Sequence, residues 1–103
     1  DGRRGTDANL PITFTLTNPY PNPFNDKISF DVLVLRDAEV AISVYDAMGR
    51  NIKQIHKGNL KSGRHKFSWS AKENSGRVTG SGIYFIKVND EKFELWRSVT
   101  LVK

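Results

Sequence analysis

Few residues of this chain could supply the nucleophile, the base or the metal ligands that an enzyme needs. The only two histidines, His56 and His65, are nine residues apart and lack the short spacing of a ligand pair. No spacing among the acidic residues singles out a catalytic pair, and most of them fall in predicted turns, where Asp accepts backbone hydrogen bonds. Cysteine is absent, which excludes a disulfide framework, a thiolate metal site and a cysteine nucleophile. We therefore expect a domain that is not an enzyme and holds no metal or cofactor.

Three glycines around residue 80 could form a loop that cradles a phosphate. Gly76, Gly80 and Gly82 lie close together, but a strand is predicted directly after them, whereas a phosphate loop leads into a helix. We interpret the segment as a tight connection between two strands, a position that glycine favours.

Large aromatic residues offer a second kind of chemistry, because their rings can stack on sugars or fill a core. The candidates for a sugar-binding platform are Tyr20, Phe24, Trp69, Tyr84 and Trp96. Trp69 shares a strand face with Phe67, and Tyr84 shares one with Ile86, which favours the core for both. Trp96 is out of phase with its apolar neighbours, so it is the more plausible exposed ring and the candidate glycan contact.

The chain has 103 residues, of which 38% are hydrophobic and 26% charged, as expected for one globular domain without a membrane-length apolar run. Its net charge of +5 is uneven, because no acidic residue lies between Asp46 and Glu73. This basic band could attract anionic lipid head groups, acidic glycans or nucleic acid, or it could be a solvated, lysine-rich strand edge. Aromatic residues do not alternate with it, so we expect no nucleic-acid partner. The basic band consists of Arg50, Lys53, Lys57, Lys61, Arg64, Lys66 and Lys72.

The pattern of apolar residues indicates which elements must position these side chains. Residues 1–9 are polar and contain glycine, which predicts a linker or a disordered tail. Short alternating runs from residue 10 onward predict a β-sandwich domain over 10–103. Three prolines in residues 19–23 preclude a helix or a central strand there. The pattern predicts an all-β, immunoglobulin-like Greek-key sandwich of about seven antiparallel strands. The predicted strands are 12–16, 28–32, 40–45, 52–56, 65–69, 83–88 and 93–102.

Five motifs follow one another in a set order between residues 20 and 103. They are Tyr20-Pro21-Asn22-Pro23-Phe24-Asn25, Ile28-Ser29-Phe30, Val44-Tyr45-Asp46-Ala47-Met48-Gly49-Arg50, Gly76-Arg77-Val78-Thr79-Gly80-Ser81-Gly82-Ile83-Tyr84-Phe85 and Leu101-Val102-Lys103. In this order and spacing the chain resembles the type A C-terminal sorting domain of the type IX secretion system. The Ig-like domain of flagellar hook-capping proteins is similar in part, but the first of the five motifs, Tyr20–Asn25, and the terminal lysine favour the sorting domain. We call Tyr20–Asn25 the opening motif. Two departures are Asp26, where the family often has proline, and Ser70-Ala71, where related domains often have Asp-Gly.

The resemblance implies two groups of residues. A structural group shapes turns and strand starts: Pro21, Asn22, Pro23, Phe24, Asn25, Tyr45, Asp46, Gly49, Arg50 and Gly76. A signal-bearing group is read during sorting: Gly82, Ile83, Tyr84, Val99, Leu101, Val102 and Lys103.

The resemblance also implies a function. The parent is expected to be an exported protein of a Bacteroidota-type bacterium that passes through the periplasm to the cell surface or the medium. The expected partners are the type IX translocon, a sortase-like signal peptidase and anionic lipopolysaccharide, with the domain itself a monomer. We expect recognition of the last strand by strand addition, or capture of the terminal carboxylate and Lys103. Deletion of Leu101–Lys103 is expected to stop export and leave folding largely intact.

Two other functions stay open from the sequence. One is a carbohydrate-binding or adhesion module appended to a secreted enzyme, for which Trp96 and the basic band are the support. The other is a structural capping or assembly domain, which would associate with itself.

Overall fold

This computed structural model describes residues 13–103 of the chain. These residues form seven strands joined by loops and contain no helix. The described residues accordingly contain no helix that could span a membrane. The predicted linker at 1–9 lies outside the described residues. The strands are β1 (Phe14–Leu16), β2 (Ile28–Val34), β3 (Ala38–Asp46), β4 (Asn51–Leu60), β5 (Gly63–Trp69), β6 (Gly82–Asn89) and β7 (Glu94–Leu101).

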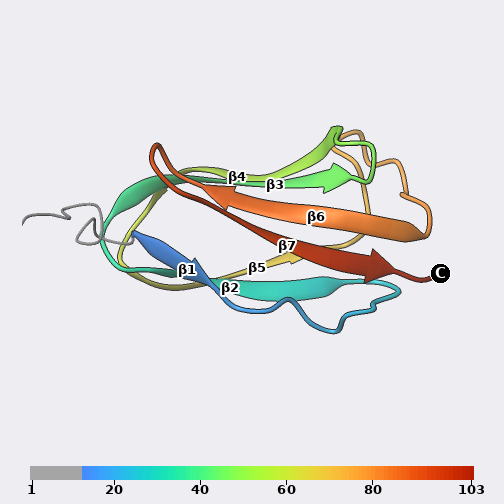
Figure 1. Ribbon diagram of the computed structural model, residues 1–103, viewed down its shortest axis with the longest axis horizontal. Helices are drawn as coiled ribbons and strands as arrows, with labels where there is room; N and C mark the ends of the chain where they lie inside the picture. The colour runs from blue at the N-terminus through green and yellow to red at the C-terminus, as the bar shows by residue number, and fades with distance from the viewer. Residues whose placement is uncertain (1–12) are drawn as a thin grey trace, which may run out of the picture.

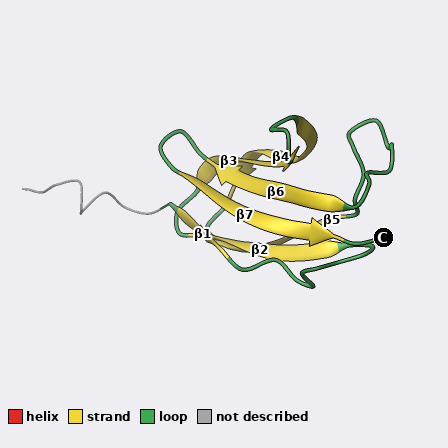
Figure 2. Ribbon diagram, turned by 45° about the vertical axis from the view of Figure 1, so that its right-hand side comes forward, coloured by secondary structure: helices red, strands yellow, loops and turns green. Residues whose placement is uncertain are grey.

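The strands form two sheets that face each other (Figure 1, Figure 2). One sheet has the order β1-β2-β5 and the other the order β4-β3-β6-β7, and every pairing between these strands is antiparallel. The chain changes sheet after β2, after β4 and after β5, so β3 and β6 are neighbours although they are not consecutive. The predicted all-β sandwich of about seven antiparallel strands is therefore confirmed.

Most strand bounds agree with the prediction, but β4 is twice as long as expected. The sequence predicts a strand over 52–56, whereas β4 spans Asn51–Leu60 and pairs with β3 along its length. Register irregularities between Ile42 and Ser43 and between Val44 and Tyr45 of β3 mark β-bulges. A bulge interrupts the alternation of apolar and polar residues, which is the signal that the prediction used.

Alternate side chains from both sheets meet between the layers and form one core. The pattern holds in β2, β3 and β6, where every second residue is apolar and buried. The buried apolar residues are Phe14, Leu16, Phe24, Ile28, Phe30, Val32, Val34, Val40, Ile42, Val44, Leu60, Trp69, Ala71, Tyr84, Ile86, Val88, Val99 and Leu101.

Trp69 joins the two sheets and the loops at one end of this core. Its ring centroid lies 5.8 Å from that of Phe24 and 5.1 Å from that of Tyr84, and its indole N–H donates to the carbonyl of Lys72 at 2.9 Å. The side chain is only 2% exposed. The predicted core positions of Trp69 and Tyr84 are thus confirmed. Ala71, where related domains often have glycine, has a φ of 62°, a left-handed conformation that disfavours any side chain.

We predict that Trp69→Ala lowers the free energy of unfolding by about 3–5 kcal/mol, because it leaves a cavity among buried rings. Urea denaturation of the chain measures this change. Trp96→Ala is the matched control, since Trp96 lies on the surface, and it should lower stability by about 1 kcal/mol or less. Similar losses for both variants would contradict the central role of Trp69.

Candidate functional site where the opening motif meets the last strand

The side chain of Asn22 binds the outer edge of β7 in the manner of a neighbouring strand. Its Oδ1 accepts a hydrogen bond from the backbone N–H of Thr100 at 2.9 Å, and its Nδ2 donates to the carbonyl of Ser98 at 3.3 Å. A side-chain amide has the same donor and acceptor as a peptide group, so it can replace a strand residue at a sheet edge. This contact joins residues that are 76 and 78 positions apart in sequence.

Phe24 continues the same pairing with its backbone. Its N–H donates to the carbonyl of Thr100 at 2.9 Å, and its carbonyl accepts from the N–H of Val102 at 2.8 Å. The pairing is parallel, with Phe24 opposite Leu101, and the Phe24 ring enters the core against Trp69. The opening motif therefore pairs with β7 in parallel over a short stretch, and its Phe24 side chain closes this end of the core.

Two prolines flank Asn22, and the peptide bonds that precede Pro21 and Pro23 are both cis. Proline has no backbone N–H and cannot donate to a further strand. The opening motif thus covers the edge of β7 and offers no donor at Pro21 or Pro23 for the next chain.

Arg97 covers the edge of β7 just before this point. Its guanidinium donates to the carbonyl of Trp96 at 3.0 Å and to the carbonyl of Leu16 in β1 at 2.9 Å. The arginine therefore bridges the edges of the two sheets where they lie side by side. An incoming strand cannot pair with residues 98–102 while the opening motif is in place. Direct strand addition to the intact domain, one of the two expected routes of recognition, does not agree with this arrangement.

The expected signal-bearing residues divide into a buried and an exposed group. Tyr84, Val99 and Leu101 belong to the core, and Leu101 is only 1% exposed. The expectation that a deletion of Leu101–Lys103 leaves folding intact is therefore wrong, because it removes a core side chain worth about 2–5 kcal/mol. Gly82 pairs with Leu101 across the two strands.

The exposed group lies at the end of the sandwich where β7 finishes, and Ile83 of this group pairs there with Thr100. Ile83 is about half exposed, and Val102 is 53% exposed. Lys103 is exposed as well, and its backbone N–H donates to Oγ of Ser81 at 2.9 Å. Val102 also borders a shallow hollow, whose remaining lining residues belong to the opening motif: Pro21, Pro23, Phe24 and Asn25. The two motifs that stand farthest apart in the sequence thus form one surface.

The hairpin between β3 and β4 has the structural role that the resemblance implies. Oδ1 of Asp46 accepts the backbone N–H groups of Met48 and Arg50 at 2.9 and 3.0 Å, and Oδ2 binds Nε of Arg50 at 2.8 Å. Gly49 has a φ of 86°, which glycine adopts without strain. The backbone hydrogen bond from Arg50 is the main reason why the pKa of Asp46 lies below its ordinary value.

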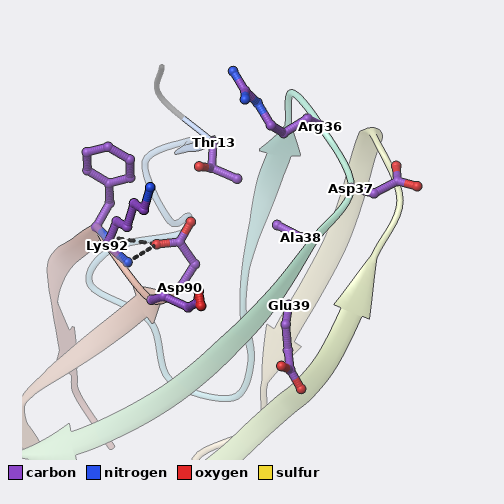
Figure 3. A pocket seen from close by; sticks show the side chains of 9 residues that line it. Thr13, Arg36, Asp37, Ala38, Glu39, Asp90 and Lys92 are labelled. Carbon is purple, nitrogen blue, oxygen red and sulfur yellow. Dashed lines mark hydrogen bonds between the residues drawn. The ribbon is translucent and has the colours of Figure 1, made fainter. Parts of the chain in front are cut away.

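An open cavity of about 370 Å³ lies at the opposite end of the sandwich, between the β2–β3 and β6–β7 connections (Figure 3). Asp90 accepts the backbone N–H groups of Lys92 and Phe93 there, at 2.8 and 2.7 Å, and Asp37 accepts that of Ser62 at 2.8 Å. Burial raises the pKa of Asp90, but these hydrogen bonds outweigh burial and hold it below its ordinary value. The carboxylates therefore stabilise turns. The lining residues are Thr13, Arg36, Asp37, Ala38, Glu39, Asp90, Glu91, Lys92 and Phe93.

The two histidines do not meet. Nε2 of His56 lies 3.2 Å from the carbonyl of Gly58, and Nε2 of His65 lies 2.7 Å from that of Lys61. Between residues 13 and 103, no three side chains of His, Cys, Asp or Glu are close enough together to hold a metal ion.

The basic band follows β4 and β5, which are edge strands of the two sheets. Asp31 binds two of its members, with Arg64 at 2.7 Å and Lys66 at 3.7 Å, and Asp46 binds Arg50. Lysines along exposed edge strands discourage pairing with other chains, so this placement fits the interpretation as a solvated edge.

Trp96 lies on the outer face of the four-stranded sheet and is 42% exposed, as its phase predicts. Its ring centroid is 5.3 Å from that of Tyr45 on β3. Nζ of Lys87, on the intervening strand β6, lies 5.2 Å from the Tyr45 centroid and 5.4 Å from the Trp96 centroid. The sequence identified Trp96 but not these partners. Strand alternation could have placed all three on an outer face, but their proximity depends on the strand order β3-β6-β7.

We predict that Asn22→Ala lowers the free energy of unfolding by about 1–2 kcal/mol and speeds hydrogen exchange at the Thr100 amide. Residue-resolved exchange by NMR measures the second effect. Asn25→Ala is a control within the same motif, because Asn25 is exposed and its side chain forms no hydrogen bond within residues 13–103. Unchanged protection of Thr100 in Asn22→Ala would contradict the role of the side-chain amide.

Asp46 should contribute to loss of stability in acid. Its pKa in the folded chain is below the ordinary value of 3.8, so its contribution is complete above that pH and disappears as the pH falls through the lowered pKa. Asp46→Asn, which keeps an acceptor and removes the charge, should reduce the acid-induced fall in the melting temperature. Thermal unfolding between about pH 2 and 6 tests this, with Asp26→Asn as the control. Equal acid sensitivity of the Asp46→Asn variant and the unmodified chain would contradict the prediction.

Comparisons with known proteins identify relatives of the fold. No curated protein matches the sequence. Dimeric latent PorU from Porphyromonas gingivalis is similar in structure with a TM-score of 0.63 and 18% identity, covering 86% of this chain and 9% of PorU. PorZ, described as an essential surface component of the type-IX secretion system of the same bacterium, has a TM-score of 0.58 and 22% identity, covering 87% of this chain and 11% of PorZ. The chain therefore spans about a tenth of either protein, and at these identities the similarity establishes the fold alone.

The sequence model of the FlgD Ig-like domain matches residues 24–92, from the end of the opening motif to the turn before β7. This match covers the strands that form most of the core, including Trp69 and the hairpin at Asp46. The chain is a member of the FlgD Ig-like domain family.

Proposed function

We propose that this domain is a non-catalytic C-terminal sorting signal, which directs an exported cargo protein through the type IX outer-membrane translocon. One observation carries the proposal. The opening motif and the terminal segment, which the resemblance singles out independently, form one surface through the contacts of Asn22 and Phe24. The fold similarity to PorU and PorZ supports it, because PorZ is described as a component of that system.

The translocon would read the end of the sandwich where the chain finishes. Ile83, Val102 and Lys103 expose their side chains there, and Val102 borders the hollow of the opening motif. Leu101 and Val99 are buried and hold this surface in position from within. Capture of the exposed apolar groups and the Lys103 ammonium requires no change in the fold.

The later steps of the proposal concern the cargo. A domain of this kind passes through the periplasm as a folded monomer, and a sortase-like signal peptidase removes it at the cell surface. The enzyme joins the cargo to anionic lipopolysaccharide, and the basic band on β4 and β5 would be attracted to such a surface.

The family match also favours a second candidate function, a structural capping or assembly domain. The match ends at residue 92 and does not include the terminal segment Val99–Lys103. The residues on which the two functions differ therefore lie outside the matched region. Sedimentation of the chain separates them, because an assembly domain associates with itself and a sorting domain stays monomeric.

We predict that export depends on the exposed side chains of the last two residues. The test uses a fluorescent reporter placed before residues 1–103, with a periplasmic signal, in a bacterium that has the type IX system. The double variant Val102→Ser, Lys103→Ser keeps the backbone hydrogen bonds of both residues and spares Leu101. The unmodified fusion should reach the surface or the medium, whereas the variant should accumulate in the periplasm.

The matched control is Leu35→Ser, Lys92→Ser, which removes one exposed apolar side chain and one lysine at the opposite end of the sandwich. It should be exported as well as the unmodified fusion. Equal export of the terminal variant would show that these side chains are not read. Periplasmic retention of every fusion would mean that the chain shares only its fold with sorting domains.

A further inference from the structure

The outer face of the four-stranded sheet carries a group of side chains that the proposed function does not use. We define the aromatic cluster as Tyr45, Lys87, Glu94 and Trp96. Lys87 and Trp96 face each other directly across β6 and β7. Tyr45 comes from β3, on the other side of β6, and its ring reaches that of Trp96 at a centroid distance of 5.3 Å.

Lys87 gives the aromatic cluster an ammonium group that is not engaged in an ion pair within residues 13–103. This ammonium lies above the rings of Tyr45 and Trp96, at 5.2 and 5.4 Å. Arg64, by contrast, is neutralised by a carboxylate at 2.7 Å. An anionic group that binds the ammonium would come to lie next to two aromatic rings.

Glu94 adds a third functional group, a carboxylate, to the rings and the ammonium. Its Oε2 accepts the indole N–H of Trp96 at 2.6 Å, which fixes the indole and leaves the other carboxylate oxygen as an acceptor. That oxygen suits the hydroxyl groups of a ligand. The same negative charge repels a ligand with many closely spaced anions, such as a nucleic acid or a polyphosphate, more strongly than a ligand with a single carboxylate on each sugar ring.

These features together select a ligand class. The exposed ring of Trp96, with the partly buried ring of Tyr45 beside it, suits the apolar face of a sugar ring. The ammonium suits an acidic substituent, and the carboxylate suits hydroxyl groups. The aromatic cluster lies on a sheet face, where an extended chain molecule can lie across neighbouring strands (Figure 2). We propose that the aromatic cluster binds an acidic polysaccharide with one carboxylate per sugar ring, a uronic-acid glycan.

This site shares no residue with the surface that the sorting proposal uses, although Ile83 lies on the same outer face of β6, four positions before Lys87. The aromatic cluster lies on the outer face, whereas the opening motif binds the edge of β7 through Asn22 and Phe24. The domain would thus contact a glycan with the face of its sheet and a translocon with its end. Glycan binding can be tested on the chain alone, so its failure is distinct from a failure of export.

The experiment titrates the 103-residue chain with trigalacturonate and follows tryptophan fluorescence and heat of binding. Cellotriose is the neutral control, and polyphosphate is the densely charged control. We expect saturable binding of trigalacturonate, and an affinity at least about tenfold lower for both controls.

Three variants assign the binding to the aromatic cluster. Trp96→Ala and Lys87→Met should each weaken trigalacturonate binding about tenfold or more, and Lys87→Met keeps the apolar stem that covers the rings. Lys57→Met, an exposed lysine of the basic band on β4, should bind as the unmodified chain does. A single cooperative thermal transition well above the assay temperature confirms that each variant folds.

Several results would overturn the proposal. These are the absence of saturable binding to trigalacturonate, equal weakening by Lys57→Met, and equal affinity for cellotriose. Tighter binding of polyphosphate would assign the surface to general charge attraction.

Discussion

The pairing of the opening motif with the end of β7 is the contact on which the arrangement of this domain depends. Asn22 supplies a side-chain amide where a strand would supply a peptide group, and Phe24 adds two backbone hydrogen bonds and a buried ring. Without this segment, β7 would have an open edge and Trp69 would lose one of its two aromatic neighbours. Arg97 closes the adjoining stretch by joining β7 to β1. The edge of a small sandwich is thereby completed by one asparagine, one phenylalanine and one arginine.

Local alternation was enough to predict most of the fold. The phase of apolar residues located seven strands, placed Trp69 and Tyr84 inside and made Trp96 the candidate for an exposed ring, because a sheet with one buried face imposes period two. The length of β4 could not be predicted, since two bulges interrupt that period. The contact of Asn22 with Ser98 and Thr100 was also beyond prediction. A side-chain amide that binds backbone groups 76 and 78 positions away does not change the alternation of apolar and polar residues, which is the pattern that the prediction uses.

The candidate site shows a further limit of reading motifs. The resemblance placed Leu101 and Val102 in one group, although one side chain lies in the core and the other is exposed. Along an edge strand, buried residues that are needed for folding alternate with exposed residues that a partner can contact. A sequence motif contains both kinds and does not distinguish them. Tyr45 and Lys87 illustrate the converse case. Each is an ordinary strand residue by itself, and the strand order alone brings them to Trp96.

The direction of the first and last segments has a mechanical consequence. The described chain begins at β1 at one end of the sandwich, and Lys103 lies at the other, while the opening motif runs parallel to β7 (Figure 1). A force that pulls these two ends apart would slide the opening motif and β7 past each other along their length. The hydrogen bonds of Asn22 and Phe24 lie across that direction, so they share the load and must break together. The same force also passes through the pairing of β1 with β2, so this contact and the β1–β2 hydrogen bonds resist extension of the domain together.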